Sequence, residues 1–185
     1  TGTKTDNVPL ILKQNIKNYL ENFKILTDDV EIQDGYIINF GVLFDVVAHK
    51  FANKNEVKLL CIEKIKDYFS TDKMQFSQPI YVSQLEYDLM NIDGVRAVNY
   101  VRLSQKDNID SVTGESVGEP LESQTYKYSI NSDGTLNVLG NSDDYGYYYD
   151  FQSALKNGVI LPPSPSNPGV FELKHPNKNI KGVVR

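Results

Sequence analysis

Residues 77–103 read SQPIYVSQLEYDLMNIDGVRAVNYVRL, a stretch that predicts an extended segment, a short helix and a strand in that order. Pro79 disfavours the α conformation at the residue before it, so the segment up to Val82 is expected to be extended. Ser83, followed three residues later by Glu86, matches the capping box that begins many helices. The sequence therefore predicts a helix that starts at Ser83.

The same stretch contains a helix end and a strand. Leu85, Leu89 and Ile92 lie at i, i+4 and i+7 and form one apolar stripe along the predicted helix. Gly94 predicts the end of this helix, because glycine adopts the left-handed conformation at little cost. Residues 95–103 then repeat with a period of two, which predicts a strand with two usable faces.

The composition limits the classes of protein that this chain can belong to. The 185 residues are 40% hydrophobic and 23% charged, as is ordinary for a soluble globular protein. The net charge is -5 and there is no basic block, which argues against binding to a nucleic acid backbone. There is no apolar run of about eighteen residues, so no membrane span is expected. The chain begins with Thr1, and we interpret it as a piece of a longer protein.

Before residue 77, the pattern predicts a helix, a hairpin and a second helix. Apolar residues at helical spacing predict the first helix from Pro9 to Phe23. Its apolar face consists of Leu12, Ile16, Tyr19, Leu20 and Phe23. Residues 30–33 are expected to form a short strand, and Asp34-Gly35 is a strong signal for a tight hairpin turn. Asn53 with Glu56 repeats the capping-box pattern and predicts a helix that ends at Phe69.

The strand that follows the predicted hairpin turn is long and apolar on both faces. A strand of this kind is either covered on both sides or uses one face to bind a partner. Asp45 and His49 lie on its second face, four residues apart. A polar pair in a site is one interpretation of these residues, and a solvated rim is the one that we favour. Cys61, the only cysteine, lies in the second helix and is expected to be buried without a disulfide.

These elements predict an α+β fold in two layers. The strand after Gly94 is expected to pair with the long strand and form a small mixed sheet backed by helices, over residues 1–104. Residues 105–185 are expected to form a β-rich extended region. Its predicted parts are a polar loop over 104–124, a hairpin over 126–138, a helical turn over 152–157 closed by Gly158, a proline-rich segment over 161–169, a short strand over 170–173 and a basic tail over 174–185.

The sequence shows no catalytic constellation. His49 and His175 are the only histidines, and neither a His-x-x-x-His nor a Cys-x-x-Cys spacing occurs, which removes the common zinc sites. The segment around Gly134 fails as a calcium loop, because the twelfth residue of such a loop must be a glutamate. We therefore predict no enzymatic activity, no metal and no cofactor.

The order of elements, and above all PIYVSQLEYDLMNIDGVRAVNYVRL, resembles the baseplate J-like family of contractile phage tails. The resemblance covers residues 9–104 and is most specific over residues 83–98. Within the family it points to the C-terminal part of the T-even-type wedge subunit. It implies a structural protein of the virion, assembled in the host cytoplasm, that forms homodimers and an inner ring. Other wedge proteins are then its partners, and its rearrangement accompanies sheath contraction.

The late tyrosine-rich and proline-rich segments predict where the chain makes assembly contacts, because aromatic side chains are enriched at protein interfaces. The predicted interface residues are Tyr145, Tyr147, Tyr148, Tyr149, Phe151, Pro162, Pro163 and Pro165. The alternative is that the aromatic residues cover the sheet of their own domain. A second alternative concerns function: the aromatic and acidic residues would line the concave site of a tail-associated glycan-binding or hydrolase domain.

Overall fold

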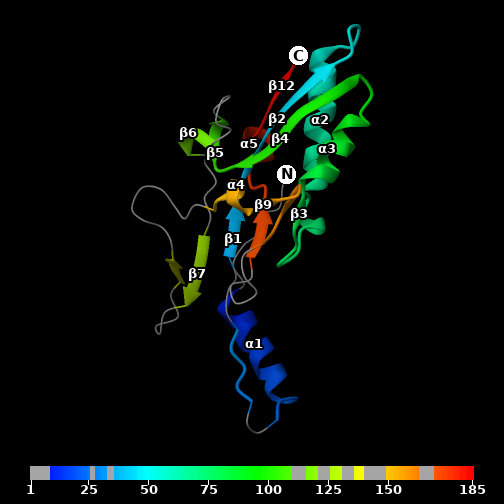
Figure 1. Ribbon diagram of the computed structural model, residues 1–185. Coiled ribbons are helices and arrows are strands. Elements are labelled where there is room, and N and C mark those ends of the chain that lie inside the picture. Colours follow the sequence, from blue (N-terminus) through cyan, green and yellow to red (C-terminus); the bar gives the residue numbers. More distant parts are fainter. Residues whose placement is uncertain are drawn as a thin grey trace.

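The computed structural model confirms an α+β fold (Figure 1). It describes residues 9–25, 28–32, 36–109, 116–120, 126–130, 136–139, 149–162 and 169–185. The helices are α1 (Leu10–Glu21), α2 (Lys54–Tyr68), the 3-10 helix η1 (Thr71–Lys73), α3 (Val82–Met90), α4 (Phe151–Ala154) and α5 (Pro176–Asn179). The strands are β1 (Tyr36–Asn39), β2 (Gly41–Ala48), β3 (Ile80–Tyr81), β4 (Val95–Ser104), β5 (Lys106–Ile109), β6 (Ser116–Pro120), β7 (Tyr126–Ile130), β8 (Leu136–Leu139), β9 (Leu155–Lys156), β10 (Val159–Ile160), β11 (Gly169–Glu172) and β12 (Ile180–Val184).

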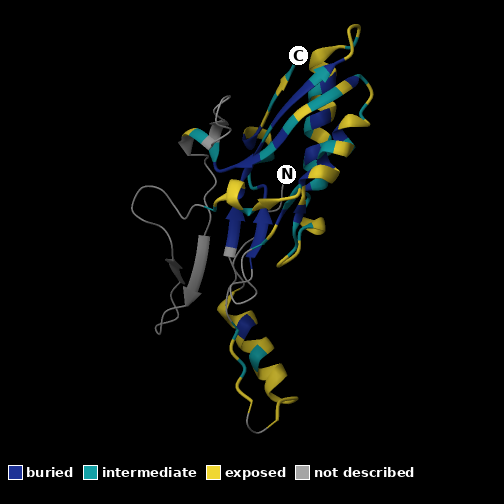
Figure 2. Cartoon of the chain, in the orientation of Figure 1, coloured by how far each residue is buried: buried dark blue, intermediate teal, exposed yellow. Residues whose placement is uncertain are grey.

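The central sheet has the order β12-β2-β4 and is mixed, as the sequence predicts. β4 pairs with β2 in the antiparallel sense, and β12 pairs with β2 in the parallel sense. The helices α2 and α3 cover one face of this sheet (Figure 1). The buried side chains gather between the sheet and these helices (Figure 2). Val42, Phe44 and Val46 point into this core because they alternate along β2.

The stretch over 77–103 forms the predicted order of elements, with one correction at the helix start. Gly94 has a φ of 88°, so the predicted left-handed helix stop is confirmed. The capping box at Ser83 is wrong, because α3 begins at Val82 and has no side-chain cap. The carbonyl oxygen of Gly158 accepts hydrogen bonds from the amides of Val82 (2.9 Å) and Ser83 (3.3 Å) instead. A distant segment therefore satisfies the helix terminus, which leaves no need for a serine cap.

The predicted hairpin is wrong on the evidence of its strands, and its turn residues Asp34 and Gly35 lie outside the described residues. Residues 28–32 form no strand, and β1 has different partners, which are β11 on one side and β7 on the other. The long strand is also divided at Phe40, whose amide donates to the carbonyl oxygen of Glu172 at 3.2 Å. A parallel partner far along the chain has therefore replaced the local pairing that the turn signal favoured.

Three corrections concern the residues after 104. The predicted polar loop contains β5 and β6, which pair with each other. The predicted helical turn over 152–157 ends at Ala154, and β9 and β10 form a tight hairpin whose turn residues Asn157 and Gly158 both have positive φ. Asn-Gly is the preferred sequence of such a turn. The predicted basic tail folds as α5 and β12, and β12 completes the central sheet.

Other predictions of this region are confirmed. β7 and β8 pair in the antiparallel sense as the predicted second hairpin, and β11 is the predicted short strand. Residues from the range 105–185 also enter the common core, among them Phe151, Phe171 and Ile180. The two ranges expected from the sequence are therefore joined by shared sheets and a shared core.

Candidate functional site

The clearest candidate site is the exposed apolar surface of α1. This helix stands at one end of the molecule, away from the central sheet (Figure 1). We call Leu12, Ile16, Tyr19, Leu20 and Phe23 the α1 stripe. Each of these side chains is between 40% and 70% exposed. The helices α2 and α3, in contrast, turn apolar residues such as Cys61 and Leu85 into the core.

The sequence of α1 explains why this helix forms and why its apolar residues share a face. Pro9 precedes the first turn, and its carbonyl oxygen accepts hydrogen bonds from the amides of Leu12 (2.9 Å) and Lys13 (3.2 Å). Within the stripe, the rings of Tyr19 and Phe23 lie 5.0 Å apart between centroids. The predicted helix is confirmed over Leu10–Glu21, and four residues of its predicted apolar face lie on it, while Phe23 lies two residues beyond the helix end. The pattern alone did not reveal that this face lies outside the core of the chain.

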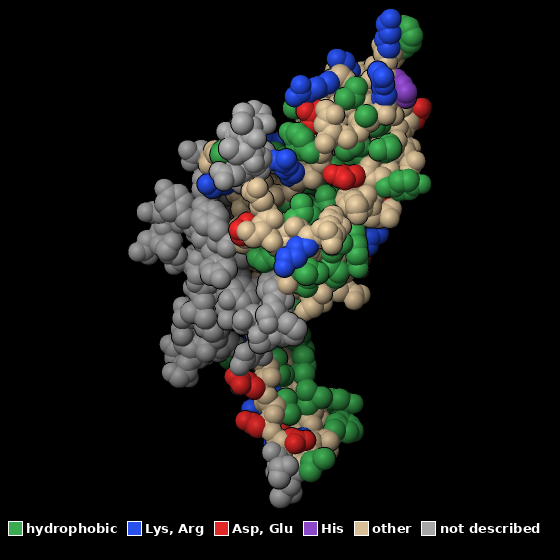
Figure 3. All heavy atoms as spheres, viewed as in Figure 1, with side chains coloured by type: hydrophobic (Ala, Val, Ile, Leu, Met, Phe, Trp, Pro, Cys, Tyr) green, Lys and Arg blue, Asp and Glu red, His purple; other side chains and the backbone are tan. Residues whose placement is uncertain are grey.

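Acidic side chains lie at the C-terminal end of this helix and in the segment that follows it. Glu21, Asp28, Asp29 and Glu31 are all exposed. They outnumber the three lysines of the same region, which are the exposed Lys24, the half-buried Lys17 and the buried Lys13. Figure 3 shows acidic side chains beside the hydrophobic ones at this end of the molecule. The site is therefore an apolar surface with an acidic border, which is the composition of a protein-binding surface rather than of a catalytic cleft.

Two of the predicted interface residues lie within the core of the chain or at its edge. Phe151 is buried, and its ring lies 5.9 Å from that of Phe40 and 6.0 Å from that of Phe171. Tyr149 is half-buried, its hydroxyl donates to the carbonyl oxygen of Leu161, and desolvation raises its pKa. For these two aromatic residues, the alternative that they cover their own domain describes the structure. Pro162 is half-buried. Tyr145, Tyr147, Tyr148, Pro163 and Pro165 lie outside the described residues.

Asp45 is not on a solvated rim, so that interpretation is wrong. Its side chain is buried on the face of the central sheet that points away from α2 and α3. One carboxylate oxygen accepts from Nδ2 of Asn99 at 3.0 Å, and the other accepts from Nε of Arg185 at 2.9 Å. His49 is exposed, and its backbone amide donates to the carbonyl oxygen of Gly94. The contacts of Asp45 attach the chain after β12 to the sheet, which is a structural role.

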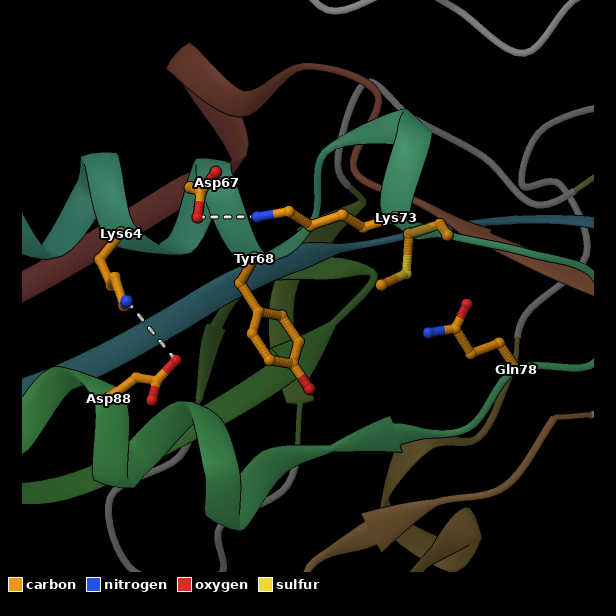
Figure 4. Close-up of a pocket in the computed structure, with 7 residues that line it drawn as sticks. Lys64, Asp67, Tyr68, Lys73, Gln78 and Asp88 are labelled. Atoms are coloured by element: carbon orange, nitrogen blue, oxygen red, sulfur yellow. Dashed lines mark hydrogen bonds and ion pairs between the residues drawn. The ribbon is translucent and has the colours of Figure 1, made fainter.

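A hollow of about 340 Å³ lies between α2, η1 and α3 (Figure 4). Its charged side chains form two pairs: Lys64 with Asp88 at 3.7 Å, and Lys73 with Asp67 at 2.8 Å. The hydrogen bond from Lys73 holds the pKa of Asp67 below its usual value. The wall also contains Tyr68, whose hydroxyl donates to the carbonyl oxygen of Tyr81 at 3.1 Å. These interactions join neighbouring elements, so the hollow is explained by the packing of the helices.

The remaining candidates for chemistry are the thiol of Cys61 and clusters of metal-ligating side chains. Cys61 is buried, as predicted, and burial raises the pKa of its thiol to about 11, which keeps it protonated and unreactive. Within the described ranges, no group of three His, Cys, Asp or Glu residues could hold a metal ion. In the part of the chain that the structure describes, no helix is both long and apolar enough to cross a membrane.

The fold and the site define a two-layer α+β protein that presents an apolar helix outside its core. Comparison of the sequence with protein-family models and with curated proteins finds no match. The choice of the α1 stripe as the candidate site therefore depends on its exposure and geometry alone.

Proposed function

We propose that this chain is a structural subunit of the baseplate wedge of a contractile phage tail and that it self-associates through the α1 stripe. The observation that carries the proposal is the exposure of five large apolar side chains, four on one face of α1 and Phe23 two residues after its end. The resemblance of residues 9–104 to the baseplate J-like family supports the assignment to a tail. In this role the chain contributes to the inner ring, binds other wedge proteins and takes part in the rearrangement that accompanies sheath contraction.

Burial of the α1 stripe supplies a large part of the free energy that a stable contact needs. Full burial of a large apolar side chain contributes about 1.5–3 kcal/mol. Because these five side chains are about half exposed on average, burying the rest of them contributes about 4–8 kcal/mol. Association costs about 4–15 kcal/mol in lost translational and rotational freedom. The stripe can therefore offset a large part of this cost, and the acidic border contributes orientation more than affinity.

The test replaces Leu12, Ile16 and Tyr19 together with glutamine, which keeps helix propensity while removing the apolar surface. The matched control is Leu59→Gln, because Leu59 is an exposed leucine on α2 outside the stripe. Sedimentation velocity over a range of concentrations then measures association, and thermal unfolding measures stability. We expect the triple variant to remain monomeric with an unchanged unfolding temperature, while the control associates like the original chain. Association of the triple variant at the original strength would refute the proposal.

A further inference from the structure

The end of the molecule opposite α1 carries a single prominent aromatic side chain. We call residues 49–53, between β2 and α2, the tip loop. Its Phe51 is 94% exposed, more than any other large hydrophobic side chain in the described residues. Figure 1 shows the β2–α2 connection and α1 at opposite ends of the molecule. The tip loop therefore extends an aromatic ring into solvent, far from the α1 stripe.

The tip loop is held in place by its own hydrogen bonds. The amide of His49 donates to the carbonyl oxygen of Gly94 at 2.9 Å, and the amide of Ala52 donates to the carbonyl oxygen of His49 at 3.0 Å. The side chain of Asn53 accepts from the amide of Asn55 at 3.1 Å and caps α2 directly after the loop. Phe51 is thus presented by a fixed turn, which reduces the entropy that a contact would have to offset.

The charge around the tip loop is opposite to the charge around α1. Lys50, Lys54, Lys58 and Arg96 lie in or beside the loop and outnumber the acids Glu56 and Asp93. The Nζ of Lys50 lies 5.7 Å from the centre of the Phe51 ring. Figure 3 shows Lys and Arg side chains gathered at this end and acidic side chains around α1. The tip-loop end therefore presents an aromatic side chain with a basic border, and the α1 end presents an apolar surface with an acidic border.

We propose that the tip loop of one copy of this chain docks on the α1 stripe of the next copy. Phe51 packs on the stripe, and the basic border of the loop faces the acidic residues Glu21, Asp28, Asp29 and Glu31. This inference rests on the proposed function and names the partner of the α1 stripe. The two surfaces are different and lie at opposite ends of the molecule (Figure 1), so an end-to-end contact between them is heterologous, and repetition of it builds a ring or an open chain.

The first experiment changes Phe51 to serine and measures association by sedimentation velocity. The matched control is Phe76→Ser, because Phe76 is also an exposed phenylalanine in a loop but lies outside the tip. A central aromatic side chain often contributes 2 kcal/mol or more to a contact, so we expect about 30-fold weaker association for Phe51→Ser. The control and the unfolding temperature should be unchanged. Association of Phe51→Ser at the original strength would overturn the inference.

The second experiment mixes two variants that cannot self-associate. The Phe51→Ser variant keeps the α1 stripe. The triple variant, with Leu12→Gln, Ile16→Gln and Tyr19→Gln, keeps the tip loop. A head-to-tail contact predicts that the equimolar mixture forms a 1:1 complex that grows no further, because each complex has one intact contact. Pairing between two α1 helices predicts no such complex and would overturn the inference.

The two experiments also separate this inference from the proposed function. If the stripe variant loses association while Phe51→Ser keeps it, the α1 stripe is an assembly site with another occupant, and only the inference fails. If the stripe variant associates normally, the proposed function fails as well.

Discussion

At the scale of single residues, Gly94 is the position where the backbone most restricts the side chain. Its φ is 88°, which residues with a side chain rarely adopt. A Cβ atom there would also lie 2.7 Å from Cγ2 of Val57 and 3.3 Å from Cβ of Ala52, both of which pack below the turn. The sequence predicted the left-handed conformation from the change of period, whereas the close approach to α2 is a tertiary contact that no local pattern contains.

Gly94→Val should therefore destabilise the protein by about 2 kcal/mol or more, because backbone strain and overpacking act together. Gly94→Ala is the matched control, since it carries the same backbone strain without a branched side chain and should cost less. Urea unfolding of both variants measures the free energies. An unchanged midpoint for Gly94→Val would contradict this explanation of the turn.

At the scale of elements, local signals predicted the helices better than the strand partners. α2 begins after the predicted Asn53 cap, because a cap and a helical period lie within a few residues of each other. β1 instead pairs with β11, more than a hundred residues further along the chain, and its predicted hairpin partner does not form. The Asn157-Gly158 hairpin had a local signal that the helical interpretation overlooked. For the candidate site, the pattern predicted the apolar face of α1 but could not tell whether the core or a partner covers it.

The position of β12 in the central sheet depends on Gly182. This residue lies opposite Phe44 in the parallel register, and a Cβ atom on it would lie 2.0 Å from Cζ of the phenylalanine ring. Gly182→Ala should therefore destabilise the protein by about 1–3 kcal/mol through overpacking. Phe44→Leu is the partner variant, and combining it with Gly182→Ala should recover part of that loss. A double-mutant cycle by urea unfolding measures the coupling, and strictly additive effects would show that β12 does not lie against Phe44.

At the scale of the whole molecule, strands from the end of the chain pair with strands from its beginning. β11 pairs with β1, and β12 pairs with β2. The core around Phe40 is also built from both halves of the chain. Its ring contacts Phe69 from the first half and Phe151 and Phe171 from the second half. This arrangement leaves α1 and the tip loop at opposite ends of one connected body, which is the geometry that a repeated head-to-tail contact requires.

A fragment of residues 1–104 should therefore fail to fold cooperatively, although the family resemblance covers most of it. The fragment lacks β11 and β12, and removal of Phe151 and Phe171 exposes Phe40, which is fully buried in the intact chain. The matched control is a fragment of residues 36–185, which lacks α1 but keeps every strand of the central sheet. Thermal unfolding followed by near-ultraviolet circular dichroism should show a sharp transition for the control and none for residues 1–104. A cooperative transition of residues 1–104 close to that of the full chain would mean that this range folds independently and that the C-terminal strands are only attached to its surface.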